Sequence, residues 1–465
     1  MTRPADLIEN LTFDEIPLGA RASLQRRLTI EDIKLFAVIS GDVNPAHVDA
    51  DYANSSRFHH IIAHGMWGGA LISALLGTRM PGPGTIYLGQ TLRFLAPVSL
   101  GDVLTVSIEA VERDEAKHRI KFHCLGITQD GKTAIEGDAE VLAPTTKIRR
   151  PRTLLPSVRM TERVHLHGLL EGASQLAPLT TAIVHPVDAQ ALRVALAAAE
   201  QGLIVPVFVG PEGRIRAAAA AAGLDLGDHR LVATEHSHAA AQRAVALARE
   251  GAVGALMSGT AHVDEFLRAV LQPALGLRTE RRLSHVMAFD VPTYPRPLFI
   301  TDAAINLAPT LEEKADIVRN AIDLAHAVGI ANPRVAILCA VEEVNPRMAA
   351  TLDAAALCKM AQRGQITGGT LDGPLAFDSA VSAAVAQAGD LGSAVAGCAD
   401  ILVAPDLESA NMLVKQLIHL ADATGAGVVV GARVPLILTG PADDPISAMA
   451  SSALALLLAR QQAGQ

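Results

Sequence analysis

The chain has 465 residues, of which half are hydrophobic and 3% are aromatic, and its formal net charge is −9. This length exceeds one ordinary hydrophobic core and predicts two or three domains. The negative charge argues against a general affinity for nucleic acid or for anionic membranes. The apolar residues are mainly Ala, Val and Leu, which favours helices and buried parallel strands.

The cysteines and the chain ends argue for a cytoplasmic protein. The four cysteines are widely spread without a C-x-x-C pair, so we expect neither a zinc site nor a disulfide framework. The N-terminal residues include acids where a signal peptide needs an apolar run, and the apolar stretch at 448–458 is too short to cross a bilayer. We expect no membrane partner, no nucleic-acid partner, and no metal or redox cofactor.

Residues 1–143 predict one buried helix followed by an antiparallel sheet, which is an α+β pattern. The apolar helix is expected at Gly65–Leu76. The last two predicted strands are joined as a hairpin by the turn Gln129-Asp130-Gly131. The predicted strands are Thr85–Phe94, Val103–Glu112, Arg119–Thr128 and Lys132–Leu142.

Residues 144–159 predict an exposed linker, because the run PTTKIRRPRT combines prolines with basic residues that resist burial. In residues 160–465, short β-branched runs alternate with Ala-rich helical stretches. Leu203–Val209, Ala336–Leu338 and Gly427–Val430 are examples of such runs. The alternation predicts a mostly parallel sheet flanked by helices, that is, an α/β region that can divide into two lobes.

The first candidate site lies in the segment SGDVNPAHVD, residues 40–49. Asp42 and His47 lie five positions apart across an Asn-Pro turn, so a turning backbone can bring the carboxylate and the imidazole to one point. Such a pair can hold a water molecule, remove its proton and return a proton elsewhere. The alternative is structural: Asp42 caps a helix and His47 lies in an ordinary polar turn.

The segment Ala63-His64-Gly65-Met66 stands directly before the predicted helix. A glycine at a helix start exposes backbone N–H groups beside the positive end of the helix dipole. Gly65 is therefore a candidate donor to a thioester oxygen as that oxygen becomes an enolate. For His64 we expect a structural rather than a catalytic role.

SGDVNPAHVD, IIAHGM and PGPGTIYLGQTLRFLAPVSLGD follow one another in family order, and residues 15–143 resemble the MaoC-like (R)-specific enoyl-CoA hydratases. The resemblance implies a hotdog fold, in which a sheet wraps a long helix, and a dimer with the site near its interface. It also implies that Asp42 and His47 are the catalytic pair and that the Gly65 amide is the oxyanion donor. The expected reaction is syn hydration of a 2-enoyl-CoA to a (3R)-3-hydroxyacyl-CoA.

Two other functions compete for this domain. A hotdog thioesterase would hydrolyse the thioester instead of hydrating the alkene, and a CoA-sensing or structural protein would catalyse nothing. The pair Asp42 and His47 together with the HGM segment favours hydration. The non-enzymatic alternative predicts that replacing either residue changes no activity.

In residues 160–465, polar residues follow the short apolar runs in several places, as at the ligand crevices of α/β sheets. Each one alone is explained by a helix cap or a turn, but together they argue for a polar, anionic ligand. The absence of G-x-G-x-x-G and of the P-loop motif argues against a dinucleotide or nucleoside triphosphate. The candidate segments and residues are Ser258–His262, Arg268, Thr301–Asn306 with Asp302 and Asn306, and Asp406–Asn411.

LMSGTAHVDEFLRAVL, FITDAAINLAPTLEEKADIV and ADILVAPDLESANMLVKQL are similar to segments of the phosphate acetyl/butyryltransferases, and the similarity covers residues 160–460. The resemblance implies an α/β/α domain of two lobes with mostly parallel sheets, a site in the cleft between them, and usually a dimer. The implied reaction passes an acyl group between CoA and inorganic phosphate, with an acyl phosphate as the other acyl carrier. The order of the two domains resembles the bifunctional enoyl-CoA hydratase/phosphate acetyltransferase proteins, and we expect a homo-oligomer formed through both domains.

One departure from the second family affects the phosphate. Family members carry Ser-Arg where this chain has Gly440 and Pro441, and a proline offers no donor for the bidentate bonds that an arginine makes. Arg268 or Arg433 are candidates for compensation, and Asp443 is a candidate base for the CoA thiol or a helix cap. The domain is therefore either a working transferase with an altered phosphate pocket or a non-catalytic module that binds acyl-CoA, forms oligomers or regulates.

Overall fold

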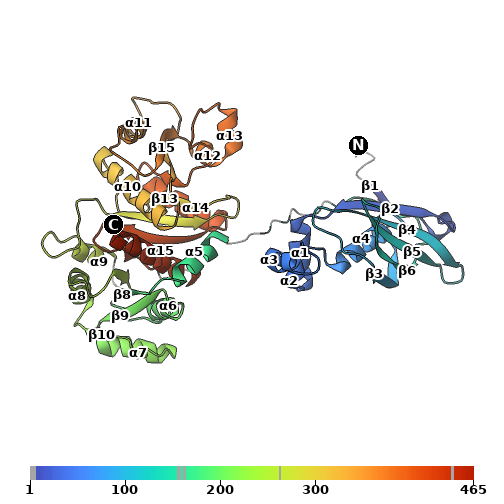
Figure 1. The fold of residues 1–465 in the computed structure, drawn as a ribbon, viewed down its shortest axis with the longest axis horizontal. Helices are drawn as coiled ribbons and strands as arrows, with labels where there is room; N and C mark the ends of the chain where they lie inside the picture. The colour runs from blue at the N-terminus through green and yellow to red at the C-terminus, as the bar shows by residue number, and fades with distance from the viewer. Residues whose placement is uncertain are drawn as a thin grey trace. The chain divides into compact units, whose positions relative to one another are not determined.

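The computed structural model describes residues 7–153, 155, 158, 160, 164–260, 263–440 and 445–464. The chain divides into two compact units, residues 1–160 and residues 161–465 (Figure 1). In the part of the chain that is described, no helix has both the length and the apolar character needed to cross a membrane.

The first unit is built on a five-stranded antiparallel sheet with the strand order β2-β4-β5-β6-β3. The expected strands and the hairpin between β5 and β6 are confirmed, and β2 is an additional edge strand whose side chains are mostly exposed. The elements are β1 (Leu7–Glu9), η2 (Phe13–Glu15), β2 (Arg21–Arg27), α1 (Ile30–Ser40), α2 (Pro45–Val48), α3 (Ala50–Ser55), α4 (Gly65–Thr78), β3 (Ile86–Phe94), β4 (Val103–Asp114), β5 (Arg119–Thr128), β6 (Thr133–Leu142) and β7 (Arg149–Pro151).

Helix α4 packs on one face of this sheet, as the apolar run predicts (Figure 1). Alternate side chains of β4 and β5 are buried, which is the period of two expected for strands with one covered face. The helix approaches β6 closely, because a Cβ atom added to Gly68 would lie 2.1 Å from Ile135 Cδ1. A larger residue at position 68 would therefore force the Ile135 side chain to move.

The linker at 144–159 stays a prediction, although its first part is paired with the N-terminal segment. β7 pairs antiparallel with β1, and the Asn10 side chain bonds the backbone of Thr146 and Ile148. The basic side chains stay exposed as expected, but Lys147 forms ion pairs with two acids of the N-terminal segment. Pairing with that segment provides hydrogen-bond partners for backbone N–H and C=O groups that an exposed linker would bond to water.

The second unit contains eleven helices and eleven strands within its described residues. The helices are α5 (Val164–Ser174), α6 (Ala189–Glu200), α7 (Glu212–Ala222), α8 (Ser237–Arg249), α9 (Val263–Val270), α10 (Leu311–Ala327), α11 (Ala349–Gln362), α12 (Phe377–Val381), α13 (Ala383–Ala388), α14 (Leu407–Leu420) and α15 (Pro445–Gly464). The strands are β8 (Leu179–Val184), β9 (Ile204–Gly210), β10 (Leu231–Ala233), β11 (Ala255–Ser258), β12 (Ser284–Asp290), β13 (Leu298–Thr301), β14 (Arg334–Leu338), β15 (Thr370–Leu375), β16 (Ile401–Val403), β17 (Thr424–Val430) and β18 (Leu436–Ile437).

All eleven strands form one sheet in the order β10-β9-β8-β11-β18-β17-β12-β13-β16-β14-β15. The strands from β10 to β18 are parallel, and so are those from β13 to β15. Between them, β17 and β12 run antiparallel to their neighbours. The predicted two-lobed, mostly parallel fold is confirmed, with the two parallel halves joined by this antiparallel centre.

The hydrophobic cores explain why the two halves form one body. On one face of the sheet a single core reaches from β9 to β14 and includes α15, whose middle part is buried. On the other face there are two separate cores, one under α8 and α9 and one under α12 and α14. The shared core joins the two lobes on one face of the sheet, and on the other face each lobe has its own core.

Candidate active sites

Asp42 lies in the loop that follows α1. The helix ends at Ser40, and Gly41 adopts a left-handed conformation with φ of 73°, which ends the helix and turns the chain. The Asp42 side chain is exposed, and its Oδ1 accepts a hydrogen bond of 3.2 Å from the backbone N–H of Asn44. This bond fixes the carboxylate in the turn and leaves its other oxygen available.

His47 lies on the one-turn helix α2. Asn44 caps this helix with its side-chain oxygen, and Pro45 occupies the first turn, where its missing N–H costs nothing. The Nδ1 atom of His47 lies 2.9 Å from the carbonyl oxygen of Ile62. Because a carbonyl only accepts, Nδ1 carries the proton and Nε2 of the neutral ring is left as a base.

His64 contacts both of these residues. Its side chain is buried, and its Nε2 donates a hydrogen bond of 2.9 Å to the backbone carbonyl oxygen of Asp42. Its ring lies against that of His47, with 4.0 Å between the centroids and 33° between the planes. The expected structural role is therefore specific, since one buried ring contacts the backbone of Asp42 and the ring of His47.

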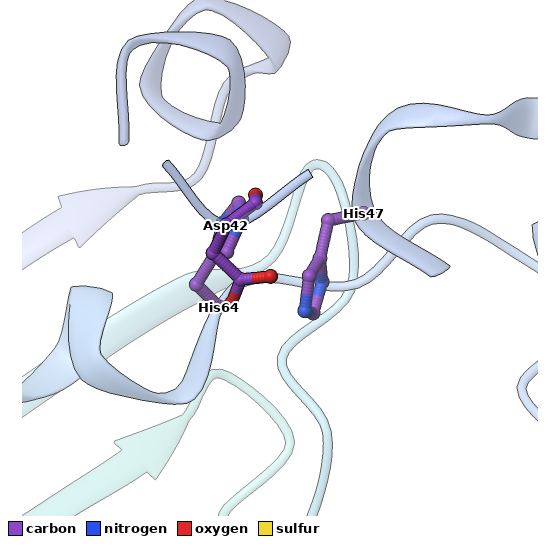
Figure 2. Close-up of side chains that lie close together, drawn as sticks. All are labelled: Asp42, His47 and His64. Carbon is purple, nitrogen blue, oxygen red and sulfur yellow. The ribbon is translucent and has the colours of Figure 1, made fainter. Parts of the chain in front are cut away.

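Asp42, His47 and His64 converge, and one polar side-chain atom of each lies within 4.8 Å of those of the other two (Figure 2). The sequence predicted that Asp42 and His47 lie together. The third residue, His64, is the N-cap of α4. One carboxylate and two imidazoles are also a ligand set that suits a divalent metal. Acid–base chemistry on water needs no metal. The expectation that this site holds no metal remains a prediction.

Gly65 begins α4, and its N–H makes no hydrogen bond with any other described residue. It borders a cavity of about 350 Å³ that also contains the rings of His47 and His64. The remaining lining residues are Arg57, Phe58, Ile62, Ala63, Trp67, Gly68, Phe94, Leu95, Ala96, Pro97, Val98 and Ile135. An open N–H beside two imidazoles in a mostly apolar cavity can stabilise a developing oxyanion.

Sequence reasoning missed Arg57, Phe58 and Phe94 as parts of this cavity. Their positions depend on how the loop before α4 packs against the end of β3, and no motif spacing carries that information. An arginine next to an aromatic residue shortly before a helix start was the one available signal.

In the second unit, the loops after β8, β11 and β18 meet at the carboxyl end of the first parallel half, and the loop after β11 begins the predicted segment Ser258–His262. Ser258 Oγ accepts a bond of 2.9 Å from the backbone N–H of Thr439, and Thr260 Oγ1 donates one of 2.9 Å to the carbonyl of His185. His185 has a positive φ of 53° and is buried. Burial lowers the pKa of His185, and the positive charge of Arg214 acts in the same direction.

Asp302 and Asn306 are buried directly after β13 and are bonded to each other. The Asp302 carboxylate accepts bonds from the backbone N–H groups of His285, Ala304, Ile305 and Asn306. Asn306 in turn accepts a bond of 2.7 Å from Arg282 Nε. In this structure the two side chains shape the loop, and their direct contact with a ligand remains a prediction.

Of the other three predicted ligand residues, the two that the structure describes are not joined to this pair. Arg268 is exposed on α9 and Asn411 is exposed on α14, and neither bonds to Asp302 or Asn306 within the described residues. Asp443 and Pro441 lie outside the described residues. The structure thus brings Asp302 and Asn306 together and leaves Arg268 and Asn411 on separate helices.

Residues 232–456 match the family model described as phosphate acetyl/butaryl transferase. A phosphate acetyltransferase of Rhizobium meliloti is 54% identical over 298 residues, which are 64% of this chain and 94% of the relative. The chain belongs to this phosphate acetyl/butyryltransferase family. A branched-chain phosphotransacylase of Enterococcus faecalis V583 has a similar solved structure, with 27% identity, a TM-score of 0.54, and coverage of 60% of this chain and 99% of that one.

This member of the phosphate acetyl/butyryltransferase family also carries a MaoC-like domain, because residues 17–129 match the family model described as MaoC like domain. R-hydratase PhaJ1 from Pseudomonas aeruginosa is 44% identical in the region aligned with its structure. That alignment covers 33% of this chain and 99% of that one, with a TM-score of 0.32. Both family assignments made from the sequence are confirmed.

Proposed function

We propose that the first unit hydrates 2-enoyl-CoA to (3R)-3-hydroxyacyl-CoA and that the second unit transfers acyl groups between CoA and phosphate. The observation that carries the first proposal is the convergence of Asp42 and His47, together with the position of His47 and Gly65 in the wall of one cavity. These are the two parts that hydration requires: a placed water and a stabilised enolate oxygen.

The reaction consists of one addition and one proton return. The Asp42 carboxylate and Nε2 of His47 hold a water molecule and take a proton from it as its oxygen bonds C3 of the enoyl group. The C2=C3 electron pair moves toward the thioester carbonyl, and the Gly65 N–H bonds the enolate oxygen that forms. Asp42 and His47 then return the proton to C2 on the same face of the double bond. Water has been added, and the enzyme is unchanged.

The experiment separates hydration from the thioesterase alternative. Full-length protein is mixed with crotonyl-CoA without phosphate, and the enoyl absorbance and free thiol are followed together. Hydration consumes the enoyl group and releases no thiol, whereas a thioesterase releases CoA. Thiol release matching the turnover of crotonyl-CoA would overturn the proposal.

The support for the second proposal is family membership together with the polar loops at the carboxyl edge of the large sheet. Gly440 and Pro441 replace the expected Ser-Arg, which removes a clamp for the phosphate oxygens. Loss of such a group commonly costs about 2.7–4 kcal/mol of transition-state stabilisation. We therefore expect transfer that is slow and needs a high phosphate concentration.

A coupled assay tests this transferase. Acetyl-CoA or butyryl-CoA is incubated with phosphate, and acyl phosphate and free CoA are measured. Equal amounts of both products support transfer. No product at any phosphate concentration would favour the alternative, in which the second unit binds acyl-CoA, forms oligomers or regulates without catalysing transfer.

We also expect a homo-oligomer. Strand β3 is a nine-residue edge strand with an open edge, and Ile86, Leu88 and Phe94 on it are exposed large apolar side chains. Such an edge is a pairing surface for a second copy. Light scattering should give a mass of at least two chains, and a monomer at micromolar concentration would contradict this expectation.

A further inference from the structure

The hydratase cavity has a buried end and an exposed end. Trp67, Gly68 and Ile135 are buried, whereas Arg57 and Phe94 are exposed. An acyl chain gains most from the buried apolar end, because removal of apolar surface from water drives its binding. The CoA portion of the substrate must then leave through the exposed end.

Arg57 is the cationic side chain of this lining. Its guanidinium carbon lies 4.7 Å from the centroid of the Phe58 ring, so the side chain rests on an aromatic face. Among the described residues it has no hydrogen bond and no ion pair with an acid. The guanidinium donors are therefore open to a ligand, and stacking on Phe58 limits the rotamer freedom that binding would cost.

The substrate supplies the matching charge. Coenzyme A carries a pyrophosphate and a 3′-phosphate at the end of its pantetheine arm, and arginine binds such groups with bidentate, charge-assisted bonds. The whole chain is negatively charged, which disfavours a polyanionic substrate away from local positive charge. A cation at the cavity mouth offsets that repulsion where the substrate enters.

Building on the proposed hydratase function, we propose that Arg57 is the residue that binds a CoA phosphate at the mouth of the hydratase cavity. It selects for enoyl groups carried on CoA over those carried on uncharged thiols. The acyl part of the substrate is held by the apolar end, and the thioester oxygen by Gly65. Arg57 thus determines which thiol carrier of the enoyl group the hydratase prefers, and it takes no part in the proton transfers.

The test compares three crotonyl thioesters in the full-length protein: crotonyl-CoA, crotonyl-pantetheine, which lacks the phosphates, and S-crotonyl-N-acetylcysteamine. Arg57→Gln should raise KM for crotonyl-CoA about tenfold, since a charge-assisted bond contributes roughly 1.5 kcal/mol or more. Its kcat, and its KM for the two phosphate-free thioesters, should stay at wild-type values. Arg57→Lys keeps the charge, so its KM for crotonyl-CoA should rise less than that of Arg57→Gln. Added salt screens the charge and should raise the wild-type KM for crotonyl-CoA more than the KM of Arg57→Gln.

The matched control is Arg21→Gln, which removes the same charge from an exposed arginine paired with Glu109 and outside the cavity lining. It should leave all three KM values unchanged. An unchanged KM for crotonyl-CoA in Arg57→Gln, or an equal loss with all three thioesters, would overturn the proposal for Arg57. Failure of the wild type to hydrate any of them would overturn the proposed function itself and this assignment with it.

Discussion

The Nε2–H of His64 donates a 2.9 Å hydrogen bond to the main-chain carbonyl oxygen of Asp42, which joins the start of α4 to the loop after α1. The same ring lies 4.0 Å from the ring of His47, centroid to centroid. We therefore expect that His64, although it is buried, positions Asp42 and His47 without itself exchanging protons. Positioning within a fraction of an ångström is what converts two ordinary side chains into a catalytic pair.

Replacing His64 should impair catalysis through position. His64→Leu keeps volume but leaves the Asp42 carbonyl without its donor, so kcat for crotonyl-CoA should fall at least about tenfold while KM changes little. Unfolding free energy should fall by about 1–2 kcal/mol. His64→Gln can still donate to that carbonyl and should retain more activity. Steady-state kinetics and thermal unfolding measure both effects, and a wild-type kcat in His64→Leu would refute the positioning role.

The acid–base pair itself should be indispensable. Asp42→Asn and His47→Ala should each lower kcat about a hundredfold or more, because each removes a group that exchanges protons with water or substrate. The matched control is His123→Gln, whose side chain pairs with Asp138 on the face of β5 away from α4. It should keep wild-type kinetics. Comparable activity in Asp42→Asn and the control would contradict the assigned roles.

Gly65 permits a test that removes one N–H and little else. Proline is accepted at the first position of a helix, and His64 has ψ of 134°, which suits a residue before proline. Any Cβ at this position meets the Phe94 ring at 3.1 Å, so Gly65→Ala is the matched control that has the Cβ and keeps the N–H. Relative to Gly65→Ala, Gly65→Pro should lose about a hundredfold in kcat. Equal kinetics of the two variants would exclude the Gly65 amide as the oxyanion donor.

Restoring the family residues should strengthen phosphate transfer. The double change Gly440→Ser with Pro441→Arg reintroduces a bidentate donor for phosphate oxygens. Acetyl phosphate formation from acetyl-CoA should rise about a hundredfold, while hydration of crotonyl-CoA in the same preparation should not change. A transfer rate no higher than that of the wild type would show that Ser-Arg is not the missing part.

Stability of the second unit should fall at mildly acidic pH because of His285. Burial lowers the pKa of this histidine, although the nearby Asp302 carboxylate opposes the shift. The unfolded chain therefore takes up a proton at this position more readily than the folded chain does, so stability is lost as pH decreases through the ordinary histidine range.

Calorimetry at pH 7.5 and 5.5 can isolate that contribution. His285→Gln should show a smaller drop in unfolding temperature between the two pH values than the wild type does. His419→Gln, at an exposed position on α14, should keep the wild-type drop. If His285→Gln and the wild type responded equally to pH, the buried histidine would not be the cause.

The first site was largely predictable from the sequence because its residues are local. Asp42 and His47 lie in one short segment, and an apolar run marks the helix that Gly65 begins. The contact between His64 and both proposed catalytic residues was not predictable, since it depends on how α4 meets a loop 22 positions earlier in the chain. The placement of Arg57 at the cavity was missed for the same reason.

The second unit was predictable in class but not in detail. Alternating β-branched and Ala-rich runs predicted the parallel sheet, yet periodicity cannot reveal that β12 and β17 run antiparallel at its centre. Polar residues after strands predicted the carboxyl-edge loops. Whether a polar side chain faces a ligand or its own backbone depends on tertiary packing, and for Asp302 the bonds go to the backbone.

Chiral analysis of the product formed from crotonyl-CoA tests the central claim most directly. The catalytic pair and the Gly65 N–H are proposed to add water on one face of the double bond, so the full-length protein should form (3R)-3-hydroxybutyryl-CoA without releasing CoA. Formation of the (3S) product, or no hydration of crotonyl-CoA or of a longer enoyl-CoA, would contradict the proposal that the first unit is an (R)-specific hydratase.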